Sequence, residues 1–461
     1  MSQGPYILPE KAQDLLNAAR KNKETSAAYN PISYRRTLTE ASKRHTGKTP
    51  REWQLDVAEA LYLGLDCIVV TGTGTGKTLP FILSNLVSEK TITLIISPLD
   101  ALESTQVSVS FDLKRETISR LTYKRQRPLM IWGYLQLSSM DRRGALDLVV
   151  CVQNSESYSP PAVLTFSIPK DLNAQKFQVI LTSPEMLYHN RDFRLTISSC
   201  RAQIKKVVID EAHCVPQWGS KFRLEYGRLD FIRTLVNKSC PVLATSATLP
   251  EYYYDEMSTC LRFNLNKTFQ INLGNDRPNI RMEIRTIKGK LDDFEDLAHI
   301  AAEASTPEGF KHRIIFSNTV EGTLKIVKSL RQHLPEDSQH KWDIAYFHSH
   351  RDAETRNQVM EDFGSGKIKI LVATEAAGMV CGHFTHHKIM NSHLQKGCDI
   401  SDIEEIIQYG CPDSLSVWVQ RAGRAGRSPN VDATAVLLVE KSIMMTKSAP
   451  KSPRKPPKKS V

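Results

Sequence analysis

The sequence has no Cys-x-x-C pair, because its nine cysteines stand singly along 461 residues. Zinc ribbons and disulfide-framed domains need closely spaced cysteines, so neither class is indicated. No apolar run is long enough to span a bilayer and no secretory pattern opens the chain, which predicts an intracellular soluble protein. A repeat of fixed period is also missing, so no repeat architecture is indicated.

Acidic residues are missing from the last fifteen positions, 447–461, which hold six Lys or Arg. Removing these six cations from the net charge of +11 leaves +5 for the remainder, a modest excess that fits contact with a phosphate backbone. The proline-rich tail cannot bury apolar area, so we predict that it is disordered. It would serve as a nuclear address, as a nonspecific DNA tether, or only as a solvated end.

Short apolar runs separated by helical-length segments determine the predicted fold class. Such runs are typical of parallel strands covered on both faces, and 41% hydrophobic residues suffice for two cores. We therefore predict an α/β fold of two tandem lobes, each a mainly parallel sheet flanked by helices. The predicted strands include 67–70, 94–96, 179–181, 207–209, 242–244, 313–316, 370–373 and 435–439. The predicted divisions are an N-terminal extension (1–45), a first lobe (46–262), a connector (263–277), a second lobe (278–446) and the tail (447–461).

Two carboxylates, Asp210 and Glu211, end one of these buried strands. Nucleotide-hydrolysing cores present one acid to Mg²⁺ and another to water in this way, so we assign the metal to Asp210 and the water to Glu211. Trp218 follows in a segment that no periodic pattern claims, and a tryptophan beside such a site suits stacking on a nucleic-acid base. The alternatives are a surface acid pair and a tryptophan that anchors the core.

A glycine-rich loop follows the first predicted strand at residues 71–78 and precedes an apolar, helix-like segment. Its backbone N–H groups are predicted to cradle phosphates, with Lys77 on the β- and γ-phosphates and the Thr78 hydroxyl on Mg²⁺. The predicted nucleotide-binding residues of the loop are Thr73, Gly74, Thr75, Gly76, Lys77 and Thr78. The general pattern has glycine where this chain has Thr71, and glycine-rich turns also occur for conformational reasons alone.

An arginine- and glycine-rich run, residues 420–427, supplies a third element. Its arginines stand three apart and would share one face of a predicted helix. We assign Gln420, Arg424 and Arg427 to catalysis, the arginines stabilising charge on the transferring γ-phosphoryl group. Such a run is also typical of a solvated or nucleic-acid-binding segment.

Together these elements resemble the superfamily 2 helicases and, among them, the RecQ family of DNA helicases in a fungal-type form that ends after the helicase core. Arg51 and Gln54 resemble the adenine-reading motif, and residues 213–226 resemble the family's aromatic-rich loop. Other segments resemble motif Ia, motif Ib, motif III, the entry to the second lobe, motif IV and motif V: 97–106, 182–185, 245–248, 275–280, 316–319 and 373–379.

The resemblance implies two RecA-like lobes with the ATP site in the cleft between them, and ATP and Mg²⁺ as cofactors. It implies 3′–5′ unwinding of single-stranded, branched or duplex DNA in nuclear repair or recombination. It also assigns nucleic-acid contact and its coupling to the ATP site to six residues: His213, Trp218, Phe222, Arg223, Ser246 and Thr248.

The chain departs from the family pattern in three places. Residues 380–396 interrupt motif V and hold four histidines, but their spacing matches no closed zinc site, so we favour an extruded loop. Residues 107–139 match nothing in the family. Both segments begin with Val directly after a motif, so we interpret them as translated introns, which spliced transcripts carrying both segments would contradict. The zinc and winged-helix subdomains that follow motif VI in the family are missing, which argues against strong autonomous unwinding.

Two further hypotheses stay open. One is a catalytically weak nucleic-acid-binding protein, or the product of a mis-spliced gene, disabled by the insert in motif V. The other is an RNA helicase of the same superfamily, against which only the aromatic-rich loop argues.

Overall fold

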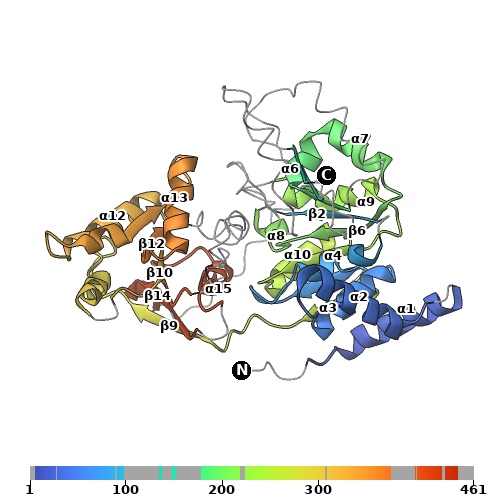
Figure 1. The fold of residues 1–461 in the computed structure, drawn as a ribbon, viewed down its shortest axis with the longest axis horizontal. Coiled ribbons are helices and arrows are strands. Elements are labelled where there is room, and N and C mark those ends of the chain that lie inside the picture. Colours follow the sequence, from blue (N-terminus) through green and yellow to red (C-terminus); the bar gives the residue numbers. More distant parts are fainter. Residues whose placement is uncertain are drawn as a thin grey trace, which may run out of the picture. The chain divides into compact units, whose positions relative to one another are not determined.

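The computed structural model describes residues 6–26, 29–88, 91–97, 134–137, 148–151, 178–218, 224–306, 309–374, 400, 402–427 and 431–444. The chain forms two compact units, residues 1–278 with 379–400 and residues 279–378 with 401–461 (Figure 1). Each unit is built on a sheet. Among the described residues, no helix combines the length and the apolar character needed to cross a membrane.

The sheet of the first unit has the order β3-β4-β5-β2-β6-β7-β1-β8. Its neighbouring strands are parallel except for the β3/β4 pair, which is antiparallel. The strands are β1 (Cys67–Val70), β2 (Ile92–Ile96), β3 (Tyr134–Leu137), β4 (Leu148–Cys151), β5 (Val179–Thr182), β6 (Ile204–Ile209), β7 (Val242–Ser246) and β8 (Phe269–Asn272).

Alternate residues of these strands enter two different cores. Leu94 and Ile96 belong to one hydrophobic cluster, whereas Ile95 between them belongs to another. Both faces of the sheet are therefore covered, which explains the continuous apolar runs in the sequence. The helices of this unit after the N-terminal pair are α3 (Glu52–Tyr62), α4 (Leu79–Ile82), α6 (Pro184–His189), α7 (Arg191–Ser199), α8 (Cys214–Trp218), α9 (Ile232–Leu235) and α10 (Glu251–Cys260), with 3₁₀ turns at Asn85–Val87 and Tyr226–Phe231.

The N-terminal extension forms two helices, α1 (Glu10–Ser26) and α2 (Pro31–Thr46), that pack on the first unit beside α3 (Figure 1). Leu16 of α1 is fully buried in the core that also holds Val69 of β1. A buried carboxylate, Glu59 of α3, accepts hydrogen bonds from Arg20 at 2.7 Å and from Arg35 at 2.6 Å. The first unit therefore includes the extension.

Glu59 supplies a test of this packing. Burial opposes its charge, but hydrogen bonds from Arg20, Tyr29 and Arg35 outweigh burial and hold the pKa of the Glu59 carboxyl below its usual value. We expect Glu59→Gln to lower the free energy of unfolding of the first unit by about 3 kcal/mol, because the half-buried Arg20 loses its carboxylate partner and Arg35 keeps only Asp56 and Glu52. Denaturant titration measures this loss. The matched variant Glu40→Gln, which removes an exposed pair with Arg36 at 4.0 Å, is expected to change almost nothing.

The pH dependence of that loss has a defined sign. Because the pKa of Glu59 is lowered in the folded chain, its stabilisation is present above the unfolded value of about 4.3. It is lost as the pH falls through the folded-state pKa. An equal effect of Glu59→Gln at neutral and strongly acidic pH would contradict this account.

The sheet of the second unit has the order β11-β12-β10-β13-β14-β9, and all its pairs are parallel. The strands are β9 (Ile280–Thr286), β10 (Arg313–Ser317), β11 (Ile344–Phe347), β12 (Ile370–Ala373), β13 (Glu405–Tyr409) and β14 (Ala433–Val439). The helices are α11 (Ala298–Ala302), α12 (Val320–Gln332), α13 (Ala353–Gly364), α15 (Leu415–Ala422) and α16 (Lys441–Met444), with 3₁₀ turns at Glu295–Leu297, Glu303–Ser305 and Gln339–Asp343. The predicted fold class, two RecA-like α/β lobes with mainly parallel sheets, is confirmed.

The segment predicted as a connector, residues 263–277, contains β8, which pairs with β1 in the first sheet. The boundary between the two compact units lies between Pro278 and Asn279. The other predicted domain limits stay predictions. The insert 380–396, the tail 447–461 and most of residues 107–139 lie outside the described residues.

Candidate active site

The phosphate loop, residues 71–78, is held by the backbone of the elements around it. The N–H of Thr71 donates to Ser246 O at 3.0 Å, and the N–H of Gly72 donates to Gly274 O at 3.1 Å. Gly74 and Gly76 have φ values of 78° and 86°, in the left-handed region where a side chain would be strained. The loop therefore has a fixed conformation that depends on these two glycines.

Thr71, which replaces the glycine of the general pattern, has a role inside the loop. Its hydroxyl donates to Thr75 Oγ1 at 3.1 Å, and the Thr75 hydroxyl donates to Gly72 O at 2.9 Å. The Thr71 side chain is buried, so this hydrogen-bond chain satisfies a hydroxyl that would otherwise be costly. The departure from the pattern thus stabilises the loop from within.

Of the two predicted adenine-reading residues, Gln54 contacts this loop, and the exposed Arg51 contacts Gln54. Gln54, in the first turn of α3, accepts a hydrogen bond from Arg51 N at 2.7 Å and donates to Gly76 O at 2.9 Å. A Cβ at Gly76 would lie 2.7 Å from Gln54 Nε2, so the close approach also requires glycine. The amide of Gln54 therefore connects the start of α3 to the phosphate loop.

The acid pair lies where β6 ends. Asp210 N donates to Ile96 O at 2.8 Å, and Glu211 has a φ of 49°, a strained conformation for a residue other than glycine. Lys77 Nζ lies 3.8 Å from Glu211 Oε1, so the phosphate-loop lysine and the second acid face one another. Lys77 and Glu211, 134 positions apart, are brought together by the pairing of strands in one sheet.

Lys77 only partly neutralises the negative charge of Asp210 and Glu211. Burial and the neighbouring charge of Glu211 raise the pKa of Asp210 to about 6, against the opposing charge of Lys77. A carboxylate in such a field favours a cation, and Mg²⁺ prefers oxygen ligands, so Asp210 fits the predicted metal. Thr78 is exposed directly before α4, where its hydroxyl is accessible as the second predicted ligand.

Three predicted coupling residues form one buried network with the acid pair. His213 Nδ1 lies 2.9 Å from Ser246 Oγ and 3.3 Å from Glu211 Oε2. The Ser246 hydroxyl donates to Thr248 O at 2.7 Å and accepts from Thr248 N at 3.2 Å. Because the serine proton is already donated to Thr248, His213 Nδ1 must carry the hydrogen of its bond to Ser246. The imidazole thus joins the end of β6 to the end of β7.

The segment after these residues was predicted as a loop, and this prediction is wrong for its first part. Residues Cys214–Trp218 form α8, because Cys214 and Val215 pack in the core of the first unit with the fully buried Tyr226. The side chain of Trp218, and Phe222 and Arg223 entirely, lie outside the described part of the chain.

The arginine run of the second unit also differs from prediction. Helix α15 ends at Ala422 and is capped by Gly423, so Arg424 and Arg427 lie in the turn that follows and do not share a helical face. Gly426, with a φ of 52°, bends this turn. Gln420 stays on α15 and, like the two arginines, is half-buried.

Arg421, in the same run, has a different environment. Its guanidinium is buried over the ring of Phe316 at 5.1 Å and donates to the side chains of Gln408 and Asn318. These contacts connect α15 to the ends of β10 and β13, so Arg421 stabilises the second unit.

Two residues that were not predicted as site residues contact the candidate loops. Arg277 Nη1 donates to Thr73 O of the phosphate loop at 3.2 Å, and Asn279 Nδ2 donates to Gly426 O at 2.6 Å. The available signal was their position: they flank Pro278, in the segment that resembles the entry to the second lobe.

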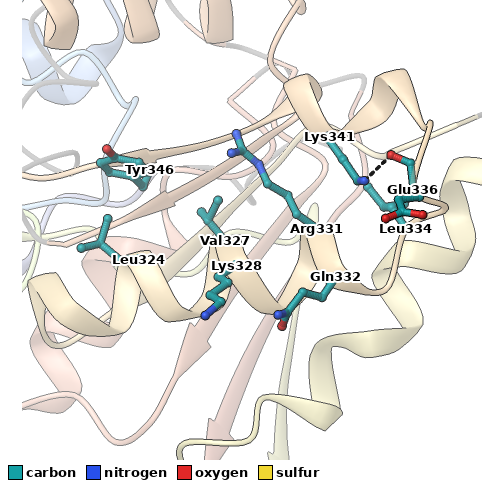
Figure 2. Close-up of a pocket in the computed structure, with 9 residues that line it drawn as sticks. All are labelled: Leu324, Val327, Lys328, Arg331, Gln332, Leu334, Glu336, Lys341 and Tyr346. Atoms are coloured by element: carbon teal, nitrogen blue, oxygen red, sulfur yellow. Dashed lines mark hydrogen bonds between the residues drawn. The ribbon is translucent and has the colours of Figure 1, made fainter.

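A surface pocket of about 750 Å³ lies along α12 in the second unit (Figure 2). Its lining combines apolar and polar side chains, three of them basic and one acidic: Leu324, Val327, Lys328, Arg331, Gln332, Leu334, Glu336, Lys341 and Tyr346. None of these is a predicted site residue. The lining also contains no residue of the turn after α15, residues 423–427, which we call the arginine turn.

Comparison with known protein families identifies the class to which this protein belongs. The DEAD/DEAH box helicase model matches residues 51–135 and 162–256, and the helicase conserved C-terminal domain model matches residues 292–429. Together they cover well over half of the chain. The chain belongs to the DEAD/DEAH-box helicases. The first match runs through residues 107–135, most of one segment that we interpret as a translated intron.

Relatives of this helicase are distant but extend over most of it. The ATP-dependent DNA helicase RecQ of Haemophilus influenzae is 26% identical over 390 residues, covering 85% of this chain and 51% of the relative. The ATP-dependent helicase wrn-1 of Caenorhabditis elegans is 27% identical over 390 residues, covering 84% and 30%. A protein of Acanthamoeba polyphaga mimivirus, provisionally named an ATP-dependent RNA helicase, is 28% identical over 259 residues, covering 56% and 41%. The chain spans about half or less of the length of these relatives.

Solved helicase structures share the fold. The helicase MrfA bound to DNA matches with a TM-score of 0.57 and 16% identity, covering 88% of this chain and 51% of that one. Dbp5 of S. cerevisiae bound to RNA and ADP BeF3 matches with a TM-score of 0.53 and 16% identity, covering 88% and 87%. The helicase therefore has the tandem-lobe architecture, with one lobe for each of the two domain models that it matches.

Proposed function

We propose that this helicase is an ATP-dependent DNA helicase or translocase of RecQ type, with 3′–5′ polarity. The observation that carries the proposal is the continuous network of Lys77, Glu211, His213 and Ser246 beside the phosphate loop. DNA-helicase relatives that match over more than four fifths of the chain support the RecQ type. A nuclear role in repair or recombination, the fungal-type form and the truncation stay predictions.

In this proposal ATP lies between the two lobes. Lys77 contacts the β- and γ-phosphates as a point charge, while Asp210 and Thr78 hold Mg²⁺, which neutralises charge on the phosphates. Glu211 orients and deprotonates the attacking water. Arg424 and Arg427 stabilise the charge that develops on the γ-phosphoryl group, and Gln420 supports them from α15.

Nucleic acid is coupled to this chemistry through His213. A base stacked on Trp218 is worth about 1–3 kcal/mol, enough to bias the position of α8, which holds this residue. Because α8 follows His213 directly, such a shift would change the hydrogen bond of His213 with Ser246 and its 3.3 Å approach to Glu211. Thr248 completes the network on the side of β7, and Phe222 and Arg223 extend the nucleic-acid contact.

The Trp218→Ala variant tests this coupling. We expect unchanged basal ATP binding and an unchanged melting temperature, with loss of stimulation by single-stranded DNA. The buried Cys214, Val215 and Tyr226 anchor the segment without Trp218, so the fold should survive. ATP turnover with and without DNA, together with thermal melting, measures both effects. Full stimulation in the variant, or a melting temperature many degrees lower, would show that Trp218 does not couple DNA binding to ATP hydrolysis.

An RNA helicase is the second candidate. The mimivirus relative and the Dbp5 complex favour it, whereas the aromatic-rich segment favours DNA by resemblance. Unwinding assays on duplexes with a 3′ or a 5′ single-stranded tail, in DNA and in RNA, separate the candidates. The proposal predicts unwinding or translocation on the 3′-tailed DNA. Activity on RNA alone would replace it, and ATP-independent binding alone would favour the catalytically weak alternative.

A further inference from the structure

The junction segment, residues 273–279, is bound along its first half to the phosphate loop. Leu273 N donates at 2.8 Å to the carbonyl of Val70, at the end of β1, and Gly274 O accepts from Gly72 N of the loop at 3.1 Å. Arg277 Nη1 then donates to Thr73 O at 3.2 Å. Thr73 is one of the residues expected to cradle phosphate, so the junction reaches the nucleotide-binding backbone itself.

The end of the junction is bound to the arginine turn of the second unit. Asn279 Nδ2 donates to Gly426 O at 2.6 Å and to Val431 O at 3.0 Å. A Cβ at Gly426 would lie 2.7 Å from Asn279 Nδ2, so the contact leaves no room for a side chain there. Gly426 stands between Arg424 and Arg427, so Asn279 fixes the backbone that carries both arginines.

Only Pro278 separates these two anchors. The Cα atoms of Arg277 and Asn279 are therefore at most about 7 Å apart, whatever the relative position of the two units. Proline fixes its own φ and restricts the preceding residue, here Arg277, to extended conformations. The three residues are a short, stiff covalent link.

We infer that Arg277, Pro278 and Asn279 form a positioning link that couples the phosphate loop to the arginine turn. The inference rests on the proposed ATP hydrolysis. A bound nucleotide that shifts the backbone of Thr73 also moves Arg277, which is hydrogen-bonded to it. The stiff link then moves Asn279 and, through its hydrogen bond, the backbone of Gly426. None of the three residues contacts the reacting atoms in this account. Their contribution is to bring Arg424 and Arg427 into register with an occupied phosphate loop.

Pro278→Gly tests the link, because it keeps both side-chain hydrogen bonds and removes only the stiffness. We expect kcat of nucleic-acid-stimulated ATP turnover to fall about 10-fold or more, as for catalytic groups misplaced by about an ångström. The KM for ATP and the melting temperature should stay at the wild-type values. The matched control is Pro335→Gly, at an exposed turn of the second unit, which should leave kcat unchanged. Wild-type kcat in Pro278→Gly overturns the inference.

A double-mutant cycle gives a second test. If Arg277 and Asn279 act through one link, Arg277→Ala and Asn279→Ala should each lower kcat by a similar factor, and the double variant should lose no more than either. Effects that multiply would show two independent roles and overturn the inference. Should Asn279→Ala unfold, since two carbonyls lose their donor, Pro278→Gly still decides.

Different results contradict the proposed ATP hydrolysis and the proposed link. A wild-type protein that hydrolyses no ATP removes the proposed function and this inference with it. A wild-type protein with normal stimulated turnover, whose Pro278→Gly variant is equally active, removes the inference alone.

Discussion

Replacing Lys77 with alanine is expected to lower ATP turnover by at least about 10²-fold, because it removes a fixed charge from the phosphates. The lysine lies 3.8 Å from Glu211 and is partly exposed, so it is not part of the core. The free energy of unfolding should therefore change by no more than about 1 kcal/mol. Steady-state hydrolysis and thermal melting of the same preparation measure the two quantities.

The control for this variant is Lys238→Ala, which removes an exposed lysine from the same unit. It should leave turnover and stability unchanged. An unaltered turnover number in Lys77→Ala would remove the assignment of the phosphate loop.

Replacing Glu211 with glutamine is expected to separate ATP binding from hydrolysis. Glutamine keeps the size of the side chain and a polar group beside His213, but it has no carboxylate to orient and deprotonate water. Hydrolysis should fall by about 10²-fold or more, while ATP affinity is retained. Equilibrium binding of a fluorescent ATP analogue and single-turnover hydrolysis give the two values.

The matched variant here is Glu256→Gln, an exposed acid on α10, which should behave as wild type. Loss of nucleotide binding in Glu211→Gln would indicate a structural role for the pair that Glu211 forms with Lys77.

Most strands predicted from the sequence are apolar runs buried on both faces, whereas the buried β13 was missed because its apolar run is only Ile406 and Ile407. Residues 94–96 read as one apolar run because Leu94 and Ile95 enter opposite cores. Strand β9 gave no such signal, because Arg281, Glu283 and Arg285 alternate along it and form ion pairs on the surface. Continuous burial is visible in composition, whereas the half-exposed edge of a sheet is not.

Site residues were predictable where a motif is local in the sequence. Lys77 and Glu211 each stand in a short motif whose chemistry is clear from neighbouring residues. The helix expected through Arg424 and Arg427 was wrong because Gly423 ends α15 and Gly426 adopts a positive φ. Spacing of arginines predicts a shared helical face only while the helix continues.

Contacts between distant segments could not be predicted in the same way. The hydrogen bonds of Arg277 with Thr73 and of Asn279 with Gly426 join residues 204 and 147 positions apart. They depend on the tertiary placement of β8 and of the arginine turn, and no local pattern encodes that placement. The internal hydrogen bond of Thr71 with Thr75 also needed the loop's conformation.

The most direct test of the account is ATP turnover by the purified protein with and without single-stranded DNA, beside an equal amount of single-stranded RNA. Coupling through His213 predicts low basal turnover that DNA raises strongly and RNA raises less. Turnover that does not respond to DNA, or that responds only to RNA, would contradict the proposal of a DNA-dependent helicase.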